Sequence, residues 1–383
     1  MLKGVTLQLY VGALVPMAPA PRVVVEALTS VTVTTKDVGQ SGFELVFMVS
    51  TKSPLHTLFL LSGGSGVSIL RIVIVVIFNG TPHVIMDGVA TKHEIRPSEQ
   101  AGYATLSVTG EDLSALMDLI DFSGFPFPST PAEGRVALLL LKYAVLGIVP
   151  VIVPSILIDV DIPTKRIPSQ RSTDLSYIRA LADDVGYVFY LDPDLVPGQG
   201  AAPGVNAAYW GPQIKVGLPQ PALNTNMDAH TNVESLSFSF NSHQNAIPTV
   251  YHYDETTHAT ITIPIPPITP LSPPLGLIPP IPMRLAPVSD DLAKRSLAQG
   301  IMIGLAKAAA WAEVVTGTGE LNVVRYGSIL KARQLVGVRG AGLAFDGLYY
   351  VKSVTHKIKR GEYKQSFELS RNGLMSTLPR LPV

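Results

Sequence analysis

The strongest constraint on the fold is a pair of β-type runs near the C-terminus, separated by the turn Arg360-Gly361. In the second run the larger side chains fall on one face and the charged and small polar ones on the other: Tyr363, Gln365, Phe367 and Leu369 against Lys364, Ser366, Glu368 and Ser370. This period of two predicts a β-hairpin over residues 344–373. The apolar residues of the first run change parity midway, from Tyr349 and Val351 to Val354 and Ile358. A β-bulge near Lys352 or Ser353 is therefore expected.

The composition limits the classes of function. The formal net charge is zero and the pI is about 7.1, so the chain lacks the positive charge with which proteins bind nucleic acid or anionic membranes. Hydrophobic residues make up 47% of the 383 residues and charged residues only 15%. Large subunit interfaces are the simplest place for this apolar excess. The chain has no cysteine, which excludes disulfides and thiolate metal sites.

One apolar stretch, residues 136–158, is long enough to cross a bilayer as a helix. However, Lys142 lies inside it, Gly147 is typical of a helix C-cap, and two prolines follow. We therefore expect a buried helix that ends near Leu146, then extended chain, and no stable membrane insertion. The β-branched stretch 71–80 predicts a strand that is buried on both faces.

The N-terminal residues 1–110 predict a first β-barrel. Short strands are separated by four turn signals: Gly39–Gly42, Ser62–Gly66, Asn79-Gly80 and Asp87-Gly88. Residues 111–230 predict a mixed α/β section, which opens with a capping box at Thr109–Asp112. Its clearest helix starts near Ser172–Asp174 and ends at Gly186, and a strand follows at once.

The C-terminal part predicts a second β-barrel from residues 231–263 and 320–383, with the hairpin at its closing edge. Residues 264–319 are expected to form an insertion in it. Ten prolines among residues 264–287 predict extended chain there, which acts as a semi-rigid arm or spacer. A helix capped by Ser289–Asp291 is expected to run through Trp311 and to end at Gly317–Gly319.

Catalytic, cofactor-binding and metal residues were sought, and none is assigned. The paired acids are Glu111-Asp112, Asp183-Asp184, Asp192 with Asp194, and Asp290-Asp291. Helix ends and turns favour such acids without any catalytic role. His93-Glu94 lacks the second histidine of a zinc protease, and His252 and His258 are expected on the surface. Gly198–Gly204 and Gly337–Gly342 do not match the spacing of a dinucleotide-binding loop, so no cofactor is expected.

Five segments resemble the late control protein D and baseplate hub family of contractile phage tails. They are residues 87–94, 104–113, 172–182, 231–239 and the hairpin 344–373. The step from helix to strand at residues 174–190 is also similar to the hub part of type VI secretion spike proteins. The proline-rich residues 264–287 are not expected from this family.

The resemblance implies a fold that is mainly β with α+β insertions, with two related antiparallel β-barrels per chain. It also implies a homotrimer in which six quasi-equivalent barrels join the sixfold tail tube to the threefold spike. The expected partners are the inner tube protein, a spike protein on a separate chain because this one stops at Val383 soon after the hairpin, and other baseplate proteins. The first residues lack a secretory signal, which predicts assembly in the bacterial cytoplasm and a place in a virion or injection-particle baseplate.

The sequence thus predicts a structural hub without enzymatic activity. Two alternatives stay open. One is a hydrolase of cell-wall glycan that uses Asp183-Asp184 or Asp192 and Asp194 as its two carboxylates. The other is a membrane-embedded protein that uses residues 136–158.

Overall fold

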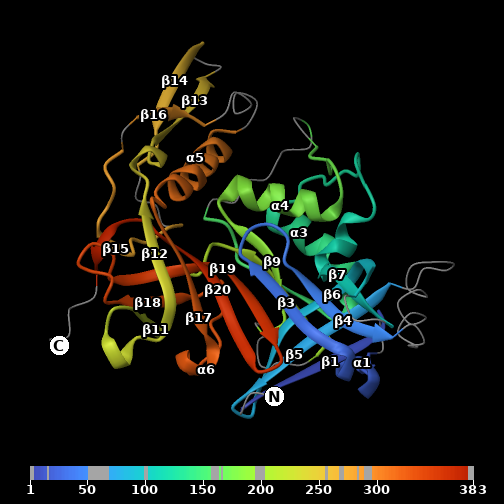
Figure 1. The fold of residues 1–383 in the computed structure, drawn as a ribbon. Coiled ribbons are helices and arrows are strands. Elements are labelled where there is room, and N and C mark those ends of the chain that lie inside the picture. The colour runs from blue at the N-terminus through green and yellow to red at the C-terminus, as the bar shows by residue number, and fades with distance from the viewer. Residues whose placement is uncertain are drawn as a thin grey trace.

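The computed structural model of the chain describes residues 4–14, 17–50, 69–98, 102–156, 164, 167–194, 203–254, 258–266, 271–282, 284–288 and 296–377. Its fold is mainly β with α+β insertions, as predicted. One large sheet runs through the lower part of the molecule, and most helices and smaller sheets lie above it (Figure 1).

The large sheet combines thirteen strands from both ends of the chain. The N-terminal half supplies β1 (Val5–Ala13), β2 (Ala18–Pro19), β3 (Leu28–Lys36), β4 (Gly42–Ser50), β5 (Leu70–Phe78), β6 (Thr81–Pro97) and β7 (Tyr103–Asp112), with α1 (Arg22–Ala27) before β3. The C-terminal half supplies β11 (Gln220–Asn224), β12 (Val233–Phe240), β17 (Val315–Asn322), β18 (Leu335–Arg339), β19 (Gly347–Lys359) and β20 (Glu362–Arg371). The strand order is β12-β17-β20-β19-β3-β4-β7-β6-β5-β1-β2, and β18 and β11 branch off beside β19.

The predicted hairpin is the pair β19–β20, and its bulge is confirmed. The register between the two strands shifts between Val351 and Ser353. Its position was predicted wrongly, because β19 pairs with β3 from Ser353↔Lys36 to Lys359↔Ser30. The hairpin therefore lies in the middle of the sheet, where it joins the two halves, and does not form a closing edge. Within the described residues, no strand pairing closes either half into a barrel.

One hydrophobic core runs beneath both halves of the sheet. It contains Val33, Phe47 and Ile74 from the N-terminal half together with Val351 and Phe367 from the hairpin, all less than 5% exposed. The strand predicted over residues 71–80 is β5, and it is buried on both faces as expected. Because the core is shared, the two halves pack as one body. The predicted boundaries at residues 110 and 230 stay a prediction.

Three glycine-containing signals were read as turns or helix ends, with different outcomes. Asn79-Gly80 forms the turn between β5 and β6, with both residues at positive φ. Asp87-Gly88 lies inside β6, and Gly317–Gly319 lies inside β17, so both of those predictions were wrong. The segments Ser62–Gly66 and Ser289–Asp291 fall outside the described residues.

The mixed section forms a small sheet covered by helices. Its elements are η1 (Leu113–Asp118), α3 (Ala132–Leu141), η2 (Ala144–Leu146), β8 (Ile148–Ile152), α4 (Asp174–Val185), β9 (Val188–Asp192), β10 (Asn206–Gly211) and η3 (Asp228–His230). The capping box predicted at Thr109–Asp112 is wrong, because these residues end β7 and Asp112 alone caps the 3₁₀ helix η1. The helix α4 begins and ends as predicted, with Thr173 as N-cap and Gly186 as left-handed C-cap.

The apolar stretch 136–158 is interrupted as expected. α3 ends at Leu141, the short helix η2 ends at Leu146, and Gly147 takes the left-handed C-cap conformation before β8 begins. Among the described residues, no helix is long and apolar enough to cross a membrane.

An arm rises from the C-terminal half (Figure 1, upper left), and it contains residues 247–254 and 258–263, which were predicted in the second barrel, as well as the inserted region. The strands β13 (Ile247–Asp254), β14 (Ala259–Pro264) and β16 (Leu285–Pro287) form a sheet beside α5 (Leu297–Trp311). Other elements here are η4 (Ser242–Gln244), the strand pair β15 (Gly276–Ile278) and β21 (Leu374–Ser376), and α6 (Val323–Tyr326). The described proline-rich residues are extended, as predicted, whereas α5 ends at Trp311 and not at Gly317–Gly319.

Candidate functional site

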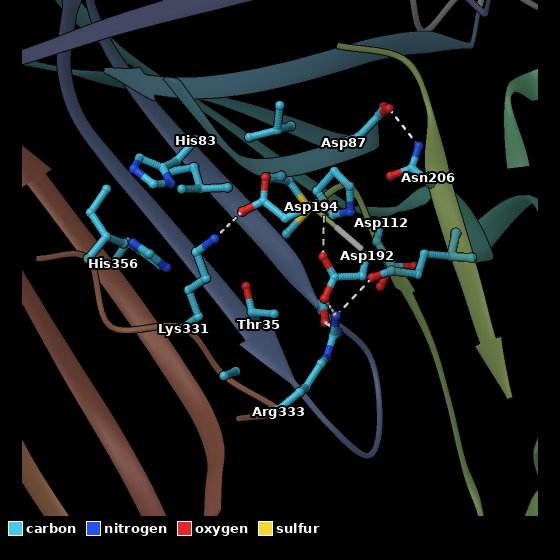
Figure 2. Close-up of a pocket in the computed structure, with 18 of the residues that line it drawn as sticks. Thr35, His83, Asp87, Asp112, Asp192, Asp194, Asn206, Lys331, Arg333 and His356 are labelled. Atoms are coloured by element: carbon cyan, nitrogen blue, oxygen red, sulfur yellow. Dashed lines mark hydrogen bonds and ion pairs between the residues drawn. The ribbon is translucent and has the colours of Figure 1, made fainter. Parts of the chain in front are cut away.

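A polar pocket lies where the two halves of the large sheet meet the mixed section. Its volume is about 100 Å³. Side chains reach it from β3, β6, β9, β10, β19 and the segment 329–334 before β18 (Figure 2). Because polar side chains from distant segments converge here, the pocket is the candidate binding or catalytic site of the chain.

Arg333 closes one side of the pocket. Its backbone is left-handed (φ 67°), which is uncommon for a residue with a side chain. Its buried guanidinium donates to the carbonyl oxygens of Lys36 (2.7 and 2.9 Å) and Leu191 (3.0 Å). The same group stacks 3.8 Å from the centroid of the Tyr190 ring. Arg333 therefore ties together the N-terminal half, the mixed section and the C-terminal half.

The acids Asp192 and Asp194, which the glycan-hydrolase alternative would use, both line this pocket. Asp192 accepts from the backbone N–H of Asp194 (2.9 Å) and lies 3.3 Å from the guanidinium of Arg333. Asp194 lies 3.0 Å from the ammonium of Lys331 (Figure 2). Each carboxylate is thus held in an ion pair with a cationic side chain.

Two histidines line one side of the pocket, at the left in Figure 2: His83 from β6 and His356 from β19. Burial lowers the pKa of His356 to about 3, so this imidazole stays neutral. Its Nδ1 lies 2.7 Å from the hydroxyl of Tyr363. The pKa of His83 is also lowered, first by burial and then by the nearby charge of Lys331. Both imidazoles are therefore neutral near pH 7, and we interpret them as packing residues of the pocket wall and not as proton-transfer groups.

Asp87, which lines the pocket, forms a buried ion pair with Arg71. The guanidinium of Arg71 binds both carboxylate oxygens of Asp87 (2.7 and 2.8 Å), and both side chains are almost fully buried. Arg71 also donates to the carbonyl oxygens of Leu14, Leu146 and Gly204. Asn206 supplies a further donor to Asp87 at 2.8 Å. The pair fixes β5 and β6 against the mixed section.

The remaining acids singled out in the sequence do not converge on this pocket as a set. Asp112 lines it, but its carboxylate caps η1 through the N–H of Ser114 (3.0 Å), and burial raises its pKa. Asp183-Asp184 lies in the last turn of α4, where desolvation raises the pKa of Asp183. Asp290-Asp291 falls outside the described residues.

The histidines named from the sequence lie apart. His93-Glu94 belongs to β6, and Glu94 pairs with Arg96 at 2.7 Å. His252 belongs to β13, and His258 precedes β14. In the part of the chain that the structure describes, no group of three or more His, Asp or Glu side chains is placed to hold a metal ion.

The glycine-rich segments give no dinucleotide-binding loop in the described residues. Gly337 lies in the strand β18, Gly340 and Gly342 follow it at positive φ, and no helix begins there. Residues 198–202 fall outside the described residues.

A second buried polar cluster joins the arm to the sheet. Glu313, just after α5, lies 2.5 Å from Lys215 and 3.5 Å from Lys352. Burial alone raises the pKa of Glu313, but the two ammonium groups outweigh it and hold that pKa below its usual value. Lys215 also donates to Ser272 at 3.2 Å. The bulge of β19 lies at Lys352, which brings this lysine into the cluster.

Sequence reasoning missed Lys331, Arg333, His356, Lys215 and Glu313. The only local signal was a pair of basic residues, Lys331 and Arg333, within an otherwise apolar stretch. Their partners lie about 100 to 300 residues away in the chain, as with Arg333 and Lys36. Such contacts cannot be read from local spacing.

Comparison with known proteins shows the fold. No protein-family model matches the chain, and no curated protein matches it by sequence. Among solved structures, a tail protein from Neisseria meningitidis is 13% identical, with 97% of this chain and 98% of that one covered at a TM-score of 0.64. The 43 kDa tail protein of prophage MuSo2 from Shewanella oneidensis is also 13% identical, with 95% and 98% covered at a TM-score of 0.58.

A third similar structure is a component of the type VI secretion system of E. coli, itself described as similar to T4 bacteriophage tail proteins. It is 13% identical, with 93% of this chain and 78% of that one covered at a TM-score of 0.53. The chain therefore has the fold of phage tail proteins and of a type VI secretion component over nearly its whole length.

Proposed function

We propose that this chain is a structural hub of a contractile phage tail or injection particle and has no catalytic activity. The observation that carries the proposal is the match to a tail protein from end to end, 97% of this chain and 98% of the other. A match of this extent leaves little of the described chain for a separate catalytic domain. The ion-paired acids of the pocket support the same role, because they hold segments together.

The proposed assembly is a homotrimer of the late control protein D type. Each chain contributes two sets of strands that share one core, one from each half of the sheet. Three chains then present six similar units. Such a ring matches a sixfold tail tube on one side and a threefold spike on the other.

A polar row across the sheet supports a hydrophilic channel wall. Thr34 lies opposite Thr355, which lies opposite Ser366, so the row crosses β3, β19 and β20. The hydroxyls of Thr34 and Thr355 are 3.0 Å apart. These side chains are only partly buried, whereas one neighbour on each strand, Val33, Val354 and Phe367, lies in the core. In the proposed ring this face lines the central channel.

The proposed partners are the inner tube protein, a separate spike protein and other baseplate proteins. The proposed place of assembly is the bacterial cytoplasm, from which the chain enters the baseplate of a virion or injection particle.

Light scattering on the purified chain tests the proposal. A trimer has a mass of 3 × 40.9 = 122.7 kDa, and electron microscopy is expected to show rings with a central pore. A parallel assay measures release of soluble fragments from purified peptidoglycan, which we expect to equal the buffer control. A stable monomer that releases fragments, with release lost in Asp192→Asn, would refute the hub and favour the hydrolase.

A further inference from the structure

An extended, proline-rich segment on the outside of the arm carries a row of uncovered apolar side chains. We call residues 277–282 and 284–287 the strap. Leu277, Ile278, Ile281 and Leu285 are all exposed, and Ile281 and Leu285 expose 81% and 66% of their surface. A soluble chain rarely leaves so many large apolar groups in a row without a partner.

The strap is held in place by backbone contacts. Ile278 pairs with Leu374 at the β15–β21 ladder. Further along, the carbonyl of Pro280 accepts from the Asn245 side chain (2.9 Å), and that of Arg284 accepts from the N–H of Ile247 (2.8 Å). Three prolines within 279–282 also restrict the backbone. A segment that is already ordered loses little conformational entropy when its side chains are covered.

A second uncovered apolar surface lies on the mixed section, and we call it the patch. It consists of Leu119, Ile120, Phe122, Phe125, Leu138 and Leu141, all exposed. The first four lie in the segment after η1, and the last two lie on α3. Lys142 joins the two groups, because its ammonium lies 4.2 Å from the centroid of the Phe122 ring and it follows Leu138 by one helical turn.

The strap and the patch are complementary in chemistry. Extended proline-rich segments bind surfaces lined by aromatic rings, and the patch presents two phenylalanine rings. Their charges also match. Arg284 is the only Lys, Arg, Asp or Glu residue from 256 to 288, and its side chain is exposed. The exposed carboxylates of Asp118 and Asp121 flank Leu119 and Ile120.

The two surfaces cannot satisfy each other within one chain in this conformation, since both are exposed. The arm, which carries the strap, rises at the upper left of Figure 1. The helix α3, which carries part of the patch, lies in the right half of the molecule. Two different surfaces on separate sides of one chain fit a head-to-tail contact, which closes into a ring when repeated. We propose that the strap of one copy binds the patch of the next copy. This inference rests on the trimer of the proposed function.

Light scattering on surface variants tests the contact. Ile281→Asp in the strap and Leu141→Asp in the patch each place a charge in the contact, and both sites are exposed, so the fold is expected to persist by circular dichroism. We expect each variant to lose the 122.7 kDa species and to run at 40.9 kDa. The control is Leu218→Asp, whose site is 99% exposed and outside both surfaces, and we expect it to stay trimeric.

Mixing the two variants gives the sharpest result. An Ile281→Asp chain keeps its patch and a Leu141→Asp chain keeps its strap, so one intact contact forms and the ring cannot close. The expected product is a pair of 2 × 40.9 = 81.8 kDa. Because the chain has no cysteine, Ile281→Cys with Leu141→Cys in one chain should also give covalent trimers on oxidation.

The outcomes separate the two ideas. A wild-type trimer that survives either Asp substitution refutes the strap–patch contact and leaves the proposed hub intact, as does a mixture that yields no pair. A wild-type chain that stays monomeric at high concentration, and whose double-cysteine variant forms no covalent trimer, refutes the trimer of the proposed function together with the contact.

Discussion

Protonation of one buried histidine is expected to make this fold sensitive to mild acid. His356 is 5% exposed, and its Nδ1 lies 2.7 Å from the hydroxyl of Tyr363. Burial lowers its pKa from 6.5 to about 3, with a smaller contribution from His83. The folded chain therefore keeps this imidazole neutral at a pH where the unfolded chain protonates it.

The sign and size of the effect follow from that difference. A pKa lowered by folding gives stability that is complete above the unfolded value of 6.5 and is lost as the pH falls toward 3. At pH 5 the loss corresponds to 6.5 − 5 = 1.5 units, and each unit contributes about 1.4 kcal/mol, so folding loses about 2 kcal/mol relative to pH 8. With a urea m-value of about 3 kcal/mol/M, the midpoint shifts by roughly 0.7 M.

The assay is urea unfolding of the wild type and of His356→Asn at pH 8 and pH 5, at one protein concentration. Asparagine keeps an acceptor for the Tyr363 hydroxyl but does not titrate. We expect the urea midpoint to fall between pH 8 and pH 5 in both proteins. The fall should be smaller in the variant, and the difference between the two falls should be roughly 0.7 M. His243→Asn, at an exposed position, serves as control and should behave as wild type. Equal pH shifts in wild type and His356→Asn would show that His356 is not the group responsible.

Three further substitutions, one of them with a matched control, test other parts of the structure by urea unfolding. Arg71→Ala leaves Asp87 buried without its cation and should cost about 3–5 kcal/mol, and a loss below about 1 kcal/mol would contradict a buried pair. Gly88→Ala places a Cβ 2.1 Å from a main-chain oxygen of β7 and should cost at least about 1–3 kcal/mol, whereas Gly337→Ala, with 3.6 Å of room, should be nearly neutral. Glu313→Gln removes the anion between two lysines and should cost about 3–5 kcal/mol, with faster hydrogen exchange in α5; unchanged exchange there would show that the cluster does not anchor the arm.

Elements with a strong local signal were predictable. The alternation in β20 needs only neighbouring residues, and so does the parity change that places the bulge of β19. The same holds for α4, whose caps Thr173 and Gly186 satisfy the groups left free at the helix ends. These features are decided within about ten residues of chain, so a single sequence contains them.

Glycines were misread where a distant partner decides the conformation. Gly88 lies in a strand because a Cβ there would meet the main chain of Glu111, and Gly319 lies in a strand under the ring of Phe367. Both glycines let neighbouring strands approach closely. In a single sequence, a glycine with this role cannot be told from a glycine in a turn. The site was missed for a related reason, since Arg333 acts on Lys36 and Leu191, which the fold alone brings near.

The place of the hairpin changes how the halves relate to each other. A hairpin at a closing edge would leave each half free to fold as a separate barrel. Because β19 pairs with β3 and its bulge lies at Lys352, beside Glu313, one strand joins both halves of the sheet to the arm. Arg333 repeats the connection on the pocket side. Because these links run between the halves and the arm, we expect the three parts to stabilise one another, which suits the proposed role as a hub.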